Sequence, residues 1–300
     1  MNNILVTGGS GLIGTHLKDV MPNAIYLSSK DFDLTKSDEV DKMISDYKPK
    51  TLVHLAARVG GILDNINYPV DYFEENILIN TNILKKCHKY DVKNLLAILS
   101  TCIYPDKVET YPMNEKELFN GPPTPTNFSY AFSKRSMAVH IDAYKQQYNK
   151  AWSYLIPCNL YGEYDKFEEH NSHFVSALIK KIYESNETLD IWGTGKPLRQ
   201  FMYAGDLARI IKHILDNKII KNLNVAPSYV HSIDEIVNIA IQACNKEHLK
   251  IVYNNDKELD GQYRKDVDSS KLLSEIGNFR FTSLDEGIKI VYDKFSTRHN

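Results

Sequence analysis

Residues 3–14 read Asn3-Ile4-Leu5-Val6-Thr7-Gly8-Gly9-Ser10-Gly11-Leu12-Ile13-Gly14. The first five are typical of a short buried strand, and a helical stretch follows the glycines. Glycines at positions 8, 11 and 14 allow a tight turn, close approach of a pyrophosphate to backbone N–H groups, and close packing of helix on strand. The N-terminus of the helix adds a favourable potential for phosphate. The segment therefore predicts a dinucleotide-binding turn, with an ordinary glycine-rich turn as the alternative.

Strand and helix patterns alternate through the first half of the chain. We expect strands at 24–27, 50–55, 94–99 and 152–156, and helices at 37–47, 71–90 and 128–148. Ser37 is the expected cap of the first of these helices. The alternation predicts an α/β fold with a Rossmann-type, doubly wound parallel sheet. Ligands bind such sheets at the carboxyl ends of the strands.

The end of the second expected strand bears on the choice between NAD and NADP. Sites that prefer NAD place an acid there, which binds the 2′-hydroxyl of the ribose. Here the sequence runs Leu27-Ser28-Ser29-Lys30, with no acid before Asp31. Two hydroxyls and a lysine better suit a 2′-phosphate, so we expect NADP(H).

The pattern changes after Gly162. Residues 163–172 are charged and irregular, and we then expect strands at 189–192 and 223–225 and helices at 174–184, 205–217, 231–244, 270–276 and 283–294. This describes a smaller, mixed α/β region. We therefore expect an NADP-binding domain over 1–162, with part of 200–225 returning to it, and a mainly substrate-binding domain over 163–300.

Composition excludes several classes of protein. Three hundred residues suit one large α/β unit or two coupled domains, and a net charge of −2 gives no basic character for nucleic acid. The four cysteines, at 87, 102, 158 and 244, show neither metal-type spacing nor the density of a disulfide framework. No apolar run approaches the length of a membrane span, and the start lacks a secretion signal. We expect a reduced, soluble, cytoplasmic protein without a metal or a membrane partner.

Five residues suggest the chemistry: Ser100, Cys102, Tyr130, Lys134 and His173. Tyr130 and Lys134 stand four apart and share one face of the expected helix. An ammonium beside a phenol favours phenolate and makes the tyrosine a usable acid or base. Ser100 ends an expected strand, where its hydroxyl could hold a carbonyl. With the glycine-rich turn, these three suggest carbonyl–carbinol redox chemistry, and Cys102 with His173 suggests a second proton transfer in the same pocket.

Each of these residues also has a structural interpretation. A cysteine after a strand is often a small buried apolar residue, as we interpret positions 87, 158 and 244. His173 could cap the helix that starts nearby. Ser100 could simply cap or end its strand.

These residues lie in longer segments that resemble a known family. The chain resembles the extended short-chain dehydrogenase/reductases over essentially its whole length and, within them, the GDP-L-fucose synthase group. The glycine fingerprint and Tyr-x-x-x-Lys are shared by the whole superfamily, whereas Val-Gly-Gly-Ile, Cys-Ile-Tyr-Pro and Asn-Ser-His are more specific to this group. The matching segments are 56–62, 67–69, 100–105, 123–127, 130–134, 159–162, 171–173 and 192–195.

The resemblance implies a nucleotide-linked 4-keto-6-deoxy sugar as substrate. Cys102 would be the base and His173 the acid that invert carbons 3 and 5, which the neighbouring ketone acidifies. Ser100 and Tyr130 would stabilise the developing oxyanion. NADPH would then reduce carbon 4 while Tyr130 protonates the new alkoxide. Lys134 would hold the nicotinamide ribose and lower the pKa of the tyrosine.

The resemblance also implies which residues bind. The cofactor set is Gly8, Gly11, Leu12, Ile13, Ser28, Ser29, Lys30, Leu55, Ala56, Ala57, Tyr130, Lys134, Pro157, Asn159, Leu160 and His173. The set for the GDP-linked sugar is Val59, Gly60, Ser100, Thr101, Cys102, Asn159, Asn171, Lys181, Trp192, Arg199 and Lys265. The long helices 71–90 and 128–148 correspond to those that form a four-helix homodimer interface in the family.

Some positions depart from the group. Gln200 stands where an acid is common, beside Arg199, which suits a diphosphate. Lys180-Lys181 replaces an expected arginine pair, and residues 165–170 differ from the usual loop. The sugar therefore stays open, with a 6-deoxy-heptose as one option. The other open alternatives are a C4-reductase alone acting on an already epimerised GDP-keto-sugar, an NAD-dependent nucleotide-sugar 4-epimerase, and a non-catalytic nucleotide sensor.

Overall fold

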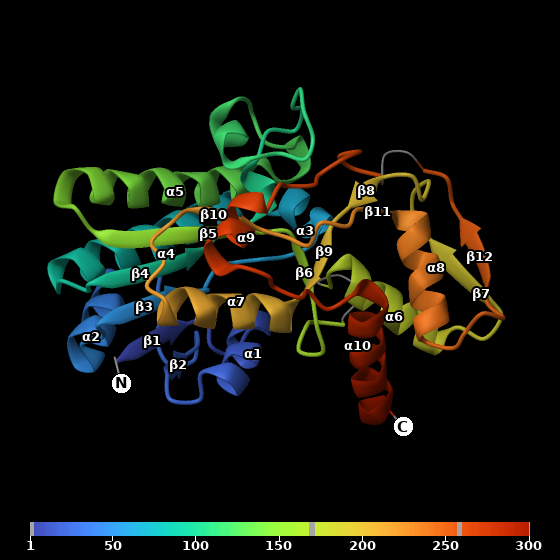
Figure 1. The fold of residues 1–300 in the computed structure, drawn as a ribbon, viewed down its shortest axis with the longest axis horizontal. Helices are drawn as coiled ribbons and strands as arrows, with labels where there is room; N and C mark the ends of the chain where they lie inside the picture. The colour runs from blue at the N-terminus through green and yellow to red at the C-terminus, as the bar shows by residue number, and fades with distance from the viewer. Residues whose placement is uncertain (1–2, 168–171, 257–259, 300) are drawn as a thin grey trace.

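A six-stranded parallel sheet forms the centre of the larger part of the molecule (Figure 1). The computed structural model describes residues 3–167, 172–256 and 260–299. The strand order is β10-β5-β4-β3-β1-β2, and the sheet is Rossmann-like, as predicted. Its strands are β1 Ile4–Thr7, β2 Ile25–Leu27, β3 Thr51–His54, β4 Asn94–Ile98, β5 Ala151–Pro157 and β10 Leu223–Val225.

The strands that follow β1 in the sequence are added on both sides of it, so the strand order reverses at β1. This strand lies between β2 and β3, with Leu5 opposite both Ile25 and Leu52. A reversal of this kind leaves a crevice at the carboxyl ends of the strands, where ligands bind. Nearly all of the strand side chains are buried, as parallel strands covered on both faces require.

Helices cover both faces of the sheet. α1 Leu12–Val20 packs against α7 Ala204–Asp216 on one face, whereas α4 Pro69–Lys89 packs against both α2 Ser37–Tyr47 and α5 Phe128–Tyr148 on the other. The expected cap at Ser37 is wrong, because Ser37 is the first helical residue and Lys36 occupies the cap without a side-chain bond. The preceding turn is instead held by Asp33, whose carboxylate accepts from the backbone N–H and the hydroxyl of Thr35.

A smaller mixed region, at the right of Figure 1, has its own hydrophobic core. Two strands of this region, β7 Thr188–Ile191 and β12 Lys250–Tyr253, pair in parallel. Two further ladders pair β6 Asn159–Tyr161 with β9 Phe201–Tyr203, and β8 Leu198–Arg199 with β11 His231–Ser232. The remaining elements are α3 Ile62–Asn67, α6 Phe174–Glu184, α8 Ile233–Ala243, α9 Ser270–Ile276, α10 Leu284–His299, and the 3-10 turns η1 Thr101–Ile103, η2 Glu115–Phe119 and η3 Pro125–Asn127.

The helix expected at 231–244 begins two residues later, at Ile233. His231 and Ser232 form β11 and pair with β8, and Ser232 caps the helix by accepting from the backbone N–H of Glu235. The Glu235 carboxylate in turn accepts from the backbone of Ser232, which completes a capping box. This start is therefore set by the capping residues rather than by the hydrophobic pattern.

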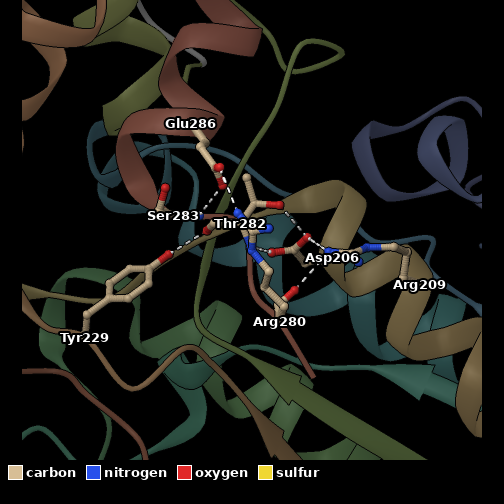
Figure 2. A network of polar contacts seen from close by, with 7 residues as sticks. All are labelled: Asp206, Arg209, Tyr229, Arg280, Thr282, Ser283 and Glu286. Atoms are coloured by element: carbon tan, nitrogen blue, oxygen red, sulfur yellow. Dashed lines mark hydrogen bonds and ion pairs between the residues drawn. The ribbon is translucent and has the colours of Figure 1, made fainter. Parts of the chain in front are cut away.

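A buried carboxylate ties the C-terminal segment to α7 (Figure 2). Asp206, in the first turn of α7, is fully buried and accepts from the backbone N–H and the hydroxyl of Thr282, at 2.7 and 2.8 Å. Arg209 pairs with the same carboxylate at 2.5 Å and also donates to the carbonyl of Arg280. These contacts fix the entry into α10, which packs on α6 and α8. Across the described ranges, no helix combines the length and apolar character needed to cross a membrane.

Candidate active site

The glycine-rich turn connects β1 to α1. Gly8 has φ +74°, and a Cβ there would lie 2.8 Å from the backbone nitrogen of Ala56. A Cβ on Gly14 would lie 2.5 Å from the carbonyl oxygen of Gly8. Gly11 caps α1, which begins at Leu12 and Ile13 and has no acidic residue in its first turn. A backbone cradle beside an unopposed helix N-terminus fits the diphosphate of a dinucleotide.

The end of β2 carries an acid that the sequence analysis did not assign. The Asp31 carboxylate accepts from the backbone N–H and the hydroxyl of Ser28, at 2.7 and 2.8 Å. These hydrogen bonds from Ser28 hold the pKa of Asp31 below its ordinary value. Ser29 and Lys30 are exposed beside it. The groups free to meet a 2′-phosphate here are therefore Ser29 and Lys30 rather than the Ser28 hydroxyl.

Tyr130 and Lys134 lie one turn apart on α5, as predicted, and both are buried. Lys134 donates from Nζ to the carbonyl of Ile98 at 3.1 Å, and burial lowers the pKa of this lysine to about 8. Burial raises the pKa of the Tyr130 phenol above its ordinary value, and the charge of Cys102 adds to this. The expected lowering of the Tyr130 pKa by Lys134 is therefore wrong for this structure, because burial raises that pKa.

Ser100 and Cys102 lie just past the end of β4. Ser100 caps η1, with its hydroxyl accepting from the backbone N–H of Cys102 at 3.3 Å. The partly buried Sγ of Cys102 accepts from Nζ of Lys265 at 3.1 Å. Burial alone would raise the pKa of the Cys102 thiol, but the charge of Lys265 and the hydrogen bond with Ser100 outweigh it, so the pKa lies below its ordinary value.

The other three cysteines differ from Cys102 in their surroundings. Cys87, Cys158 and Cys244 are buried free thiols, and burial raises the pKa of each above its ordinary value. Only for Cys102, among the cysteines, do neighbouring groups outweigh burial. Within the described ranges, no group of three or more His, Cys, Asp or Glu side chains could hold a metal ion.

His173 pairs with a buried carboxylate. Its Nδ1 lies 3.0 Å from both oxygens of Asp165, which also accepts from the hydroxyl of Ser176 at 2.5 Å. The hydrogen bond with Asp165 raises the pKa of His173, burial opposes it, and the charges of Asp165 and Cys102 add to the rise. His173 occupies the cap position of α6, but its side chain makes no capping bond. The capping interpretation of His173 therefore fails, and the imidazole is held by Asp165 instead.

Three cationic or aromatic side chains of the predicted sugar-binding set lie in the smaller region. Arg199 donates to the carbonyls of Leu198 and Asp260, at 2.9 and 3.0 Å, and burial lowers its pKa to about 10. Nζ of Lys181 lies 5.0 Å from the centre of the Trp192 ring, which is 55% exposed. An exposed indole beside an ammonium is suited to stack on a planar group.

Further predicted residues line the neighbouring loops. Val59 is exposed, and a Cβ on Gly60 would lie 2.0 Å from the hydroxyl of Tyr72. The fully buried Tyr72 ring meets Tyr130 edge to face, with ring centres 6.2 Å apart. Gly60 is thus packed against Tyr72, the ring that contacts Tyr130.

Most of the remaining residues predicted to bind the cofactor or the sugar lie in strands or in the turns that follow them. Asn159, at the start of β6, donates to the carbonyl of Gln200 at 3.1 Å. Leu55 continues the pairing of β3 through a bond to the carbonyl of Thr7. The others lie beside them: Ala56 and Ala57 follow Leu55, Thr101 is buried in η1, Pro157 ends β5, and Leu160 lies in β6. Asn171 lies outside the described residues.

The structure gathers the predicted reactive residues at one edge. Hydrogen bonds and electrostatic effects link Cys102 to three of them, Ser100, Tyr130 and His173. They also link it to Arg199 and Lys265 of the predicted binding set. The partner of His173, Asp165, was not predicted. A histidine ring is often held by a carboxylate or a carbonyl, but residues 163–172 contain several acids and the sequence does not distinguish among them.

The chain matches the NAD dependent epimerase/dehydratase family over residues 4–226. It is 37% identical to a GDP-L-fucose synthase of Dictyostelium discoideum, over 95% of this chain and 92% of that protein. It is 34% identical to a GDP-L-colitose synthase of Yersinia pseudotuberculosis, over 99% of each. The NADP-bound structure of a GDP-L-fucose synthetase from Naegleria fowleri superposes with a TM-score of 0.88 at 32% identity, covering 99% of this chain and 93% of that one. The chain belongs to the NAD dependent epimerase/dehydratase family and, within it, to the GDP-L-fucose synthase group.

Proposed function

We propose that this protein inverts carbons 3 and 5 of a GDP-4-keto-6-deoxy sugar of the mannose type and then reduces carbon 4 with NADPH. One observation carries the proposal. Cys102 and His173 each have a charged partner. Lys265 acts to lower the pKa of the Cys102 thiol, and Asp165 acts to raise the pKa of the His173 imidazole. A thiolate and an imidazolium at one edge are a base and an acid. The names of the relatives support the substrate class.

The inversions need proton transfer on two faces of the sugar. The Cys102 thiolate takes the proton from a carbon next to the ketone, and the carbon-4 oxygen becomes an enolate. Ser100 and Tyr130 stabilise that oxygen by hydrogen bonds. His173 returns a proton to the opposite face, and Asp165 holds its ring in place and favours the cation.

The reduction needs a proton at the carbon-4 oxygen. NADPH, when bound, supplies the hydride. Tyr130 donates its phenolic proton to the alkoxide, which is a stronger base than a phenolate. Lys134, with a pKa of about 8, is largely cationic at neutral pH and holds the ribose of the cofactor.

The binding residues follow the two regions of the chain. We assign cofactor binding to residues 1–162 together with β10, and sugar binding mainly to residues 163–300. Gly8, Gly11 and the first turn of α1 would hold the diphosphate, and Ser29 with Lys30 the 2′-phosphate. Arg199 would meet the diphosphate of GDP, and Trp192 the guanine or the sugar. A 6-deoxy-heptose, a precursor for capsule or lipopolysaccharide, is the second candidate, favoured by the departures in the loop at 165–170.

We also propose a cytoplasmic homodimer built on α4 and α5. These helices pack together and expose apolar side chains that include Val70, Phe73, Leu78, Phe128 and Val139. Joining two such pairs into a four-helix interface would cover them. A light-scattering mass near that of two chains is expected, and a mass near one chain would refute this assignment.

The function is tested by mixing enzyme, NADPH and GDP-4-keto-6-deoxymannose and following cofactor oxidation. Tyr130→Phe is expected to lose reduction by about 100-fold or more, because a positioned acid contributes on that scale. Tyr148→Phe, which changes an exposed tyrosine of α5, is the matched control and should keep its rate. Equal rates for wild type and Tyr130→Phe would contradict the assigned role, and NADH working as well as NADPH would contradict the cofactor choice.

A further inference from the structure

We infer that Lys265 is a positioning residue whose ammonium holds Cys102 as a thiolate. Lys265 belongs to the set of residues predicted to bind the GDP-linked sugar. In the structure its Nζ instead donates to Sγ of Cys102 at 3.1 Å, across 163 residues of chain. The importance of this pair for turnover rests on the proposed function, but the pair itself is a property of the protein alone.

The segment that carries Lys265 is fixed on both sides. Its neighbours Arg264 and Asp266 bind each other through two hydrogen bonds of 2.6 and 3.0 Å. The carbonyl of the buried Asp266 accepts from the backbone of Met113 at 2.9 Å. Both flanking side chains are thereby occupied with each other, and Lys265 between them reaches the thiol.

Gln200 fixes the same segment from the other side. It is buried; its Oε1 accepts from the backbone of Val267 at 2.9 Å, and its Nε2 donates to the carbonyl of Val267 at 3.2 Å. A third bond joins Nε2 to the carbonyl of Pro227 at 3.0 Å. An amide can make this combination because it both donates and accepts, whereas a carboxylate only accepts. Gln200, which stands where an acid is common in the group, thus anchors the segment that carries Lys265.

Other side chains also act on Cys102. Ser100, on the same turn, hydrogen-bonds to it, and His173, at the start of α6, adds a favourable charge. Arg199 on β8 and Tyr130 on α5 also interact with it electrostatically. Lys265 is the charged group whose contact with Sγ is a direct hydrogen bond, and its charge is the largest influence opposing burial.

The chemistry assigned to Lys265 involves no transfer of its own proton. When Cys102 acts as base, the carbon–hydrogen bond of the sugar breaks, the S–H bond forms, and the electron pair stays on the enolate. The ammonium keeps its three protons and stabilises the thiolate before the step. Removing the charge should therefore change how much thiolate exists at neutral pH, not whether the step can occur.

The test is the pH dependence of alkylation of Cys102 by iodoacetamide, followed by mass spectrometry of its peptide. The thiolate forms a carbon–sulfur bond and iodide leaves, so the rate reports the thiolate fraction. Lys265→Met and Lys265→Gln should each raise the midpoint by about one pH unit and slow alkylation about tenfold at pH 7. Lys265→Arg, which keeps the charge, and Lys271→Met, which removes an exposed lysine, should stay near wild type.

The two outcomes separate the inference from the proposed function. A wild-type midpoint in either charge-removing variant that remains folded by circular dichroism would overturn the inference. The alkylation assay needs no sugar, so its result does not depend on whether the proposed substrate is correct. With the sugar in deuterated water, Lys265→Met should exchange about tenfold more slowly at pH 7 and recover above the shifted midpoint. A rise in KM alone, with an unshifted pH profile, would instead make Lys265 a phosphate-binding residue.

Discussion

Asp165→Asn is the most informative single change, because it alters one charge and almost no volume. Asp165 is buried with 4% of its side chain exposed, and both of its oxygens lie 3.0 Å from Nδ1 of His173. Its hydrogen bond is the largest cause of the raised pKa of His173. An asparagine keeps an oxygen that can accept from Ser176 but removes the negative charge. The pKa of His173 should therefore fall.

The size of the fall can be bounded. An opposite charge in direct contact shifts a pKa by about 1–3 units. Because 44% of the His173 side chain is exposed, solvent screens the pair and the lower end applies. We expect a fall of about one unit, which leaves about tenfold less imidazolium at any pH above both pKa values. If His173 donates the proton during inversion, exchange at neutral pH slows by the same factor.

Two measurements check this expectation. NMR titration of the His173 ring protons gives its pKa directly, in wild type and in Asp165→Asn. The pH profile of deuterium exchange into the sugar gives the functional consequence, and its alkaline limb should move to lower pH by the same amount. Asp190→Asn, at an exposed position of β7, is the matched control and should change neither. An unshifted His173 pKa in Asp165→Asn would refute the electrostatic argument.

Three further outcomes are expected. Asp206→Ala should lower the free energy of unfolding by about 3 kcal/mol, because buried donors lose their acceptor; a urea curve that matches wild type would contradict this. His54 is buried with its pKa lowered to about 3 by burial, so the folded state excludes a proton that the unfolded chain binds below about pH 6.5. Stability should therefore fall by up to about 1.4 kcal/mol per pH unit between pH 6 and 4, and His54→Gln should flatten this dependence in thermal melts. Gly60→Ala should cost about 1–3 kcal/mol, since its Cβ would lie 2.0 Å from the Tyr72 hydroxyl, and a variant as stable as wild type would show that the loop yields.

The elements that the sequence predicted well are those set by local periodicity. The long helix at 128–148 and the helix at 174–184 have the predicted bounds. In the helix at 174–184, the apolar positions recur at helical spacing. Several short elements were missed, although β10 and α9 have the predicted bounds. α3 has only six residues, and β12 is a half-exposed strand stabilised by its pairing with β7 rather than by its own pattern.

The reactive residues of the site could be predicted from the sequence, but their hydrogen-bond and ion-pair partners could not. The five reactive residues were found because their types and spacings suit proton transfer. Two of the partners come from distant segments: Lys265 lies 163 positions beyond Cys102, and Ile98 lies 36 positions before Lys134. Nothing in the local sequence sets the direction of a lysine side chain, so the pairing of Lys134 with a carbonyl rather than with Tyr130 required the structure.

One measurement tests the central claim most directly: the complete reaction of GDP-4-keto-6-deoxymannose with NADPH in deuterated water, analysed by mass spectrometry and NMR, with Cys102→Ser beside the wild type. The account predicts deuterium at carbons 3 and 5 of the wild-type product, protium from the cofactor at carbon 4, and loss of the label in Cys102→Ser. Reduction at carbon 4 without any deuterium at carbons 3 and 5 would contradict it and leave a C4-reductase alone.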